Sequence, residues 1–195
     1  MGGNFGGVEY LDYPSMDLFT RGKRRISPTA YKFKFMKMYN NKMEGNQLKI
    51  YEKFIDYMIK NRKKNEIRLS DRNIGLQISN IVFTDNLDDG FKNSHGWKGF
   101  SRFMDEKIER KQKVCSYKDN TNPLFNFENL EVISCKFHNI IKSLLDSKAE
   151  GIIFIYSDFI YSGILPLALA LEHIGIEKYG GKNILNYPEW KEGSD

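Results

Sequence analysis

Residues 151–175, GIIFIYSDFIYSGILPLALALEHIG, decide the fold that the sequence predicts. Five apolar residues, 152–156, run without alternation into the polar turn Ser157-Asp158, and an apolar pattern at helical spacing follows over 165–174. An unbroken apolar run is typical of a strand buried on both faces, as in a parallel sheet covered by helices. The sequence therefore predicts a buried central strand at 152–155, then a turn and a helix, within an α/β fold.

The bulk composition permits several kinds of function. The chain has 195 residues, of which 41% are hydrophobic, which is enough for the core of one domain or slightly more. Lysine and arginine exceed aspartate and glutamate by five, 30 against 25, and this mild excess permits binding to a polyanion without requiring it. An ordinary solvated surface explains the same excess.

The cysteines, histidines and apolar runs of the sequence bear on metal binding, membrane insertion and location. The two cysteines, Cys115 and Cys135, and the three isolated histidines lack the spacing of metal ligands. The most apolar stretch, 151–171, is interrupted by Asp158 and Pro166, whereas a membrane span needs ~20 predominantly apolar residues. The first residues do not resemble a signal peptide. We therefore expect no metal site, no membrane anchor and a reducing, intracellular location.

Apolar residues at helical spacing indicate further helices. These helices are expected at 47–62, after the capping residues Ser70 and Asp71, at 97–108, and after the capping residue Ser134. The charge run 107–113 is expected to end the third of them. Aromatic residues that alternate with lysines predict an edge strand at 31–35, and the glycine-rich residues 1–30 are expected to be irregular.

Four short motifs, in order along the chain, resemble those of superfamily 2 helicases of the Swi/Snf-like type. Residues 43–51, in which Gln47 and Tyr51 are four apart, are similar to a "serine-x-x-glutamine-x-x-x-tyrosine" helix of that family. Residues 77–82, QISNIV, resemble its "leucine-arginine-x-isoleucine-cysteine-asparagine" helix. The third motif, Ser134-Cys135-Lys136, is similar to its serine-glycine-lysine lead-in. Residues 151–159 resemble the fourth helicase motif, the strand that opens the second RecA-like lobe. The sequence of residues 153–179 is most similar to the helicase-like transcription ATPases of large DNA viruses.

The resemblance implies a division of the chain into three parts. Residues 1–30 would be an irregular N-terminal segment, and 31–130 the end of the first lobe with a mostly helical inter-lobe region. Residues 131–195 would be the incomplete start of the second RecA-like lobe, a parallel strand plus helices. The full-length family enzyme would use ATP and magnesium to translocate on nucleic acid, in transcription.

The residues that handle ATP in such motors are missing from this sequence. The Gly-Lys pairs at 22–23 and 181–182 lack both the following hydroxyl residue and the glycine five positions before, so neither is a phosphate loop. Asp105-Glu106 imitates the acidic pair that holds magnesium but follows no buried strand. The arginine-finger motif is absent, and the resemblance places it beyond Asp195. We therefore expect no catalytic residue and no cofactor in this chain, which alone should not hydrolyse ATP.

Four residues are candidates for nucleic-acid binding. Ser157 ends the predicted strand, where α/β proteins place ligands and where the resemblance implies a nucleic-acid face, so its hydroxyl could hold a phosphate. Alternatively, Ser157 caps the next helix, and both roles are compatible. The basic residues Arg62, Lys63 and Lys64 could neutralise phosphates or form solvated surface. Lys136 matches the lysine of the lead-in, although a lysine in a first turn is usually solvated.

Two other classes of function remain open at this point. The chain could be a protein-interaction module without motor ancestry, or a free-standing nucleic-acid binder that uses its basic runs without turnover. For the motor fragment, the expected partners are DNA or RNA without sequence preference and the rest of the motor or the transcription machinery, with no membrane. A viral protein of this kind would lie in the host cytoplasm or the virion.

Overall fold

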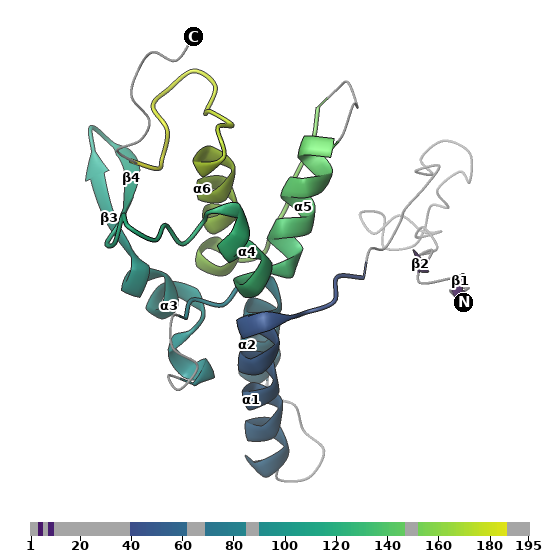
Figure 1. The fold of residues 1–195 in the computed structure, drawn as a ribbon. Helices are drawn as coiled ribbons and strands as arrows, with labels where there is room; N and C mark the ends of the chain where they lie inside the picture. The colour runs from purple at the N-terminus through teal and green to yellow at the C-terminus, as the bar shows by residue number, and fades with distance from the viewer. Residues whose placement is uncertain are drawn as a thin grey trace, which may run out of the picture. The chain divides into compact units, whose positions relative to one another are not determined.

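The computed structural model describes residues 40–61, 69–84, 90–146 and 152–186, together with two very short strands near the N-terminus. The chain divides into the units Met1–Asn41 and Lys42–Asp195. In the first unit, β1 (Asn4–Phe5) pairs antiparallel with β2 (Val8–Glu9). The second unit holds the other described elements and is a mixture of helices and antiparallel sheet (Figure 1). The edge strand predicted at 31–35 lies outside the described residues.

Helices α1 (Gly45–Asn61) and α2 (Leu69–Asn80) pack against each other and confirm the first two predicted helices (Figure 1). The face of α1 that carries Gln47, Ile50 and Phe54 is buried. The predicted cap of α2 is wrong, because Ser70 and Asp71 lie inside its first turn. In that position the Asp71 carboxylate interacts favourably with the positive end of the helix dipole, but Asp71 is not the N-cap residue.

Helix α3 (Gly96–Phe103) is shorter than predicted and leads into a hairpin of β3 (Met104–Glu109) and β4 (Gln112–Tyr117). The predicted helix is therefore wrong beyond residue 103. The charge run 107–113 spans the end of β3, the turn and the start of β4, and the turn residues Arg110 and Lys111 have positive φ angles of 48° and 68°. Two successive residues in this conformation match the right-handed twist of a hairpin.

Helix α5 (Cys135–Asp146) confirms the helix predicted after Ser134, whose hydroxyl oxygen accepts the backbone N–H of Phe137 at 3.1 Å. The preceding helix, α4 (Phe127–Ile133), was not predicted. The side chain of Asn126 caps α4 by accepting the backbone N–H of Asn129 at 2.6 Å. Both N-terminal side-chain caps satisfy backbone donors that a helix otherwise leaves unpaired.

The strand predicted at 152–155 is wrong for this chain. Ile152 and Phe154 are 99% and 86% exposed, and no backbone hydrogen bond joins 152–156 to another described residue. The described sheets are two-stranded and antiparallel, and none takes up this segment. An apolar run records a preference for burial, but a strand is buried only where other strands pair with it. No parallel RecA-like sheet is therefore present among the described residues.

Helix α6 (Leu165–His173) confirms the helix predicted after the turn, and its leucine stripe is part of the core. A wide turn, Ile160–Ile164, precedes it and packs against α2 and α3. After α6 the chain returns to β4, where Cys115 donates to Ile184 O and its carbonyl accepts from Asn186, both at 2.7 Å. The buried Glu172 carboxylate holds this return by accepting the backbone N–H groups of Ile184 and Leu185.

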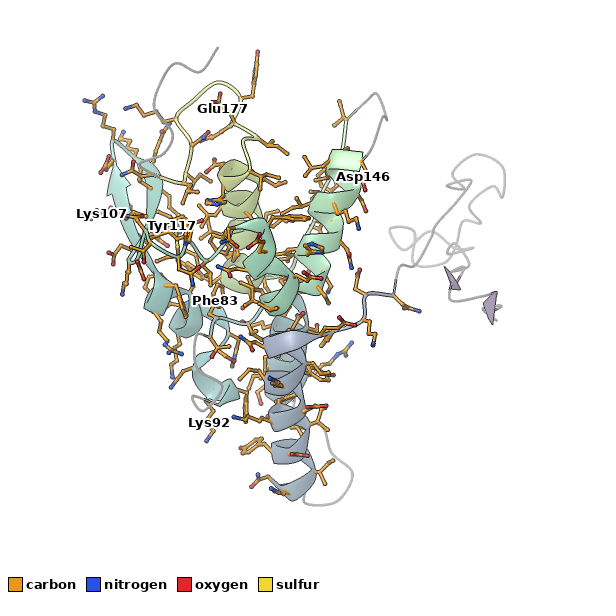
Figure 2. All side chains as sticks on the ribbon, viewed as in Figure 1. Phe83, Lys92, Lys107, Tyr117, Asp146 and Glu177 are labelled. Carbon is orange, nitrogen blue, oxygen red and sulfur yellow. The ribbon has the colours of Figure 1, made fainter. Side chains whose placement is uncertain are left out.

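One hydrophobic core joins these elements, and Phe83, Phe100 and Phe125 are its largest fully buried side chains. Phe83 lies well inside the second unit in Figure 2. Burial raises the pKa of the Cys115 thiol to about 11, so it remains protonated and serves as a packing group. Among the described residues, no helix combines the length and apolarity that crossing a bilayer requires.

Candidate nucleic-acid interface

Gln47 joins three of the motif segments through two hydrogen bonds. Its side chain is fully buried, its Nε2 donates to the carbonyl of Ile78 at 3.0 Å, and its Oε1 accepts the backbone N–H of Cys135 at 3.0 Å. The partners lie 31 and 88 positions along the chain. A buried amide must find partners for its donor and its acceptor, and here they come from the end of α2 and the start of α5.

Asn80 forms a second joint, at the C-terminus of α2. Its Oδ1 accepts from Nζ of Lys136 at 2.6 Å, and its Nδ2 donates to the carbonyl of Ser162 at 3.0 Å. The backbone carbonyl of Asn80 also accepts the hydroxyl of Ser134 at 2.5 Å. One asparagine therefore fixes the start of α5 and the wide turn before α6 relative to α2.

A cavity of about 250 Å³ lies beside the Asn80 joint. Its polar lining comes from Asn80, Lys136, Ser157 and Asp158, and the rest is mostly apolar. Two of the residues that the sequence singled out, Ser157 and Lys136, thus lie at the same cavity although they are 21 positions apart. We refer to this hollow as the Lys136 cavity.

Ser157 holds a turn and does not cap a helix. Its hydroxyl accepts the backbone N–H of Phe159 at 3.3 Å and lies 3.3 Å from the carbonyl of that residue. The wide turn before α6 begins after Phe159 and has no side-chain cap. The alternative role as a helix cap is therefore wrong. The hydroxyl also lies so close to Gly163 that any side chain there would collide with it.

Lys136 is a half-buried cation at this cavity. Burial lowers the pKa of its ammonium group, and the neighbouring Cys135 acts in the opposite direction more weakly. Asp158 lines the same cavity, but no ion pair joins Lys136 to a carboxylate among the described residues. A partly desolvated cation is stabilised by a nearby anion. The Lys136 ammonium can therefore receive an anion, whereas the hydroxyl hydrogen of Ser157 is directed at the carbonyl of Phe159.

The remaining sequence candidates do not join this cavity. Arg62, Lys63 and Lys64 lie outside the described residues. Asp105 and Glu106 are consecutive on β3, so their side chains point to opposite faces and cannot share an ion. Glu106 instead pairs with Lys113 at 2.7 Å.

Neither a phosphate loop at Gly181-Lys182 nor a cluster of metal-binding side chains is found in the described part of the chain. Gly181-Lys182 belongs to the turn after α6 and opens no helix, whereas a phosphate loop leads into a helix N-terminus. No group of three or more His, Cys, Asp or Glu in the described part of the chain is arranged to hold a metal ion.

Comparison of this chain with protein-family models, with curated proteins and with solved structures finds no match. The resemblance to superfamily 2 helicases therefore depends on the four motifs and on how their residues meet in the structure. Sequence reasoning named Gln47 and the motif that contains Asn80 but assigned neither residue a role. The available signal was a polar side chain on an otherwise apolar helix face, which burial requires to be hydrogen-bonded.

Proposed function

We propose that this chain is a nucleic-acid-facing part of an ATP-dependent superfamily 2 motor of the Swi/Snf-like type that works in viral transcription. The observation that carries the proposal is the pair of joints made by Gln47 and Asn80. They link the segments that resemble the glutamine-tyrosine helix, the asparagine helix and the serine-glycine-lysine lead-in. These hydrogen bonds support treating the three motifs as parts of one unit.

In this proposal the Lys136 cavity contacts the phosphate backbone. The ammonium of Lys136 and, once it releases the carbonyl of Phe159, the hydroxyl of Ser157 supply the groups that commonly position a nucleic acid without reading its sequence. ATP, magnesium and the residues that handle them belong to other parts of the motor. Such a motor works inside the infected cell or the virion.

The exposed segment 152–156 also supports a motor fragment. Ile152 and Phe154 are large apolar side chains that water surrounds in this chain, and exposed apolar strands with unpaired backbone are normally paired or covered. The opening strand of a RecA-like lobe would be covered by strands from elsewhere in that lobe. The finer assignment to a second RecA-like lobe is part of this proposal.

A protein-interaction module is the second candidate, and a specific groove favours it. A hollow of about 760 Å³ lies between α1 and α2, with Ile55, Ile59, Leu69 and Leu76 exposed in its lining. Apolar grooves between helices are common docking sites for partner helices. If the chain does not bind nucleic acid, the protein-interaction module becomes the preferred function.

We expect the purified chain to release no phosphate from ATP above a blank, with or without DNA. The reason is that the phosphate loop, the acidic pair and the arginine finger are not found in this sequence. A coupled phosphate-release assay at saturating ATP and magnesium measures this. Turnover that nucleic acid stimulates and that a substitution in this chain abolishes would contradict the expectation.

The chain is expected to bind DNA or RNA weakly, without sequence preference, and less tightly as salt rises. Each phosphate contact adds roughly −0.9 to the slope of log affinity against log salt on duplex DNA. Lys136→Gln keeps a donor for Asn80 but removes the charge, so the slope should become less steep by about one unit. Fluorescence anisotropy of labelled oligonucleotides over a salt series gives the slope.

Lys142→Gln is the matched control, because Lys142 is exposed on the same helix and does not line the Lys136 cavity. It should leave the slope nearly unchanged. Reversal of Arg62, Lys63 and Lys64 to Glu should weaken binding to all sequences alike. Affinity that is independent of salt, or no binding at low salt, would refute the proposed phosphate contact.

A further inference from the structure

A third hollow, separate from the Lys136 cavity, lies where α1, α2, the turn Phe91–Asn93 and the start of α3 meet. Its volume is about 610 Å³, within the range of ~300–1,000 Å³ that ligand sites usually have. Six of its lining residues suit a nucleic-acid base or its phosphate, namely Tyr57, Gln77, Lys92, His95, Trp97 and Lys98. We call it the Trp97 groove.

Trp97 gives this groove an exposed but fixed aromatic ring. The indole is 49% exposed, yet Tyr161 meets it edge-on at 5.0 Å between ring centroids and Phe100 lies 6.2 Å away. The start of α3 is also fixed, because Gly96 donates its backbone N–H to the hydroxyl of Ser162 at 2.6 Å. A large ring that is already ordered loses little entropy when a ligand stacks on it.

The charges around the groove favour an anionic ligand. Lys92 and Lys98 are exposed on its lining, and Lys92 points away from the ribbon in Figure 2. The Lys92 ammonium lies 5.5 Å from the ring centroid of Tyr57, within reach of a cation–π contact. Among the described residues that line the groove, Asp71 is the acidic one. The described lining therefore carries two cations and one carboxylate, a positive excess that suits phosphate.

Polar groups in the groove match the edge of a base. Nδ1 of His95 lies 2.9 Å from the carbonyl of Phe91, and burial lowers the pKa of this histidine. The ring is therefore neutral at pH 7, Nδ1 donates to the carbonyl, and Nε2 is left as an acceptor. The Gln77 amide offers both a donor and an acceptor, so the groove can satisfy either kind of base atom.

We propose that the Trp97 groove binds an unpaired base of a single-stranded nucleic acid, with the base stacked on Trp97 and its flanking phosphates near Lys92 and Lys98. This inference rests on the proposed function and specifies its partner as single-stranded. Stacking on aromatic rings and tracking of the backbone by cations are the two components of such binding. Bases inside a duplex are already stacked on each other and cannot reach a ring held in a groove.

The experiment uses the intrinsic fluorescence of the groove. The chain has two tryptophans, so the variant Trp190→Phe leaves Trp97 as the sole reporter. Titration with a twelve-residue oligothymidine should quench Trp97, whereas a duplex of equal length should bind without comparable quenching. In an otherwise wild-type chain, Trp97→Leu should weaken binding of the single strand by about 5–150-fold, and Trp97→Phe should recover most of it.

The outcomes separate this inference from the proposed function. Salt-dependent binding of both oligonucleotides, with no quenching and no effect of Trp97→Leu, would overturn the Trp97 groove and leave the phosphate contact intact. Quenching by the single strand in the Trp190→Phe variant supports the groove even if Trp97→Leu proves unfolded by circular dichroism. No binding of either oligonucleotide at low salt would overturn both.

Discussion

Replacement of Phe83 with Ala is expected to lower the free energy of unfolding by about 3–5 kcal/mol. The ring is fully buried and meets Phe100 edge-on at 5.9 Å between centroids. Gly99 also lies against Phe83, so closely that any side chain at that position would collide with it. Removal of the ring therefore leaves a cavity that the neighbouring helix cannot fill without moving. Urea unfolding followed by circular dichroism measures the loss.

Phe154→Ala is the matched comparison, with the same change of side chain in an exposed position. Phe154 is 86% exposed, so its removal should change the free energy of unfolding by less than about 0.5 kcal/mol. A buried central strand, which the unbroken apolar run predicts, would instead give a loss of about 3–5 kcal/mol at this position. A loss of that size for Phe154→Ala would mean that the segment is a buried strand after all.

The contrast between these two phenylalanines shows what local sequence can predict. Helices α1, α5 and α6 followed from apolar spacing and from the Ser134 cap, because all of this information lies within a few residues. Burial of residues 152–155 depends on other strands, which the apolar run does not specify. The apolar run therefore shows that residues 152–155 favour burial, but it does not show whether other strands are present to bury them.

The β3–β4 hairpin was missed for a different reason. Met104 and Ile108 lie four positions apart, so they extend the apolar spacing of α3 although they belong to a strand. The turn residues Arg110 and Lys111 have positive φ angles without being glycine, asparagine or aspartate, so the usual signal for a tight hairpin is absent. Only the pairing with β4 distinguishes a strand from a helix here.

Local sequence also predicts only part of the candidate site. Ser157 and Lys136 could be named because each belongs to a short motif, but no local pattern shows that they line one cavity. The role of Asn80 depends on partners 56 and 82 positions away. Contacts of that range are set by packing of whole helices, which apolar spacing alone does not determine.

Gln47→Met is expected to lower the free energy of unfolding by about 2–4 kcal/mol. Methionine has nearly the shape of glutamine, so the change removes two hydrogen bonds without opening a large cavity. The carbonyl of Ile78 and the N–H of Cys135 would both be left buried without their partner, and each unsatisfied group costs about 1–3 kcal/mol.

Gln112→Met provides the control, since Gln112 is exposed at the start of β4 and its replacement should stay within about 0.5 kcal/mol of wild type. Denaturant unfolding of the two variants and the wild type gives the comparison. If Gln47→Met proved as mild as the control, the link between α1, α2 and α5 would contribute little to stability. There would then be no reason to treat the three motif segments as one unit linked by Gln47. The main support for a motor fragment would be lost with it.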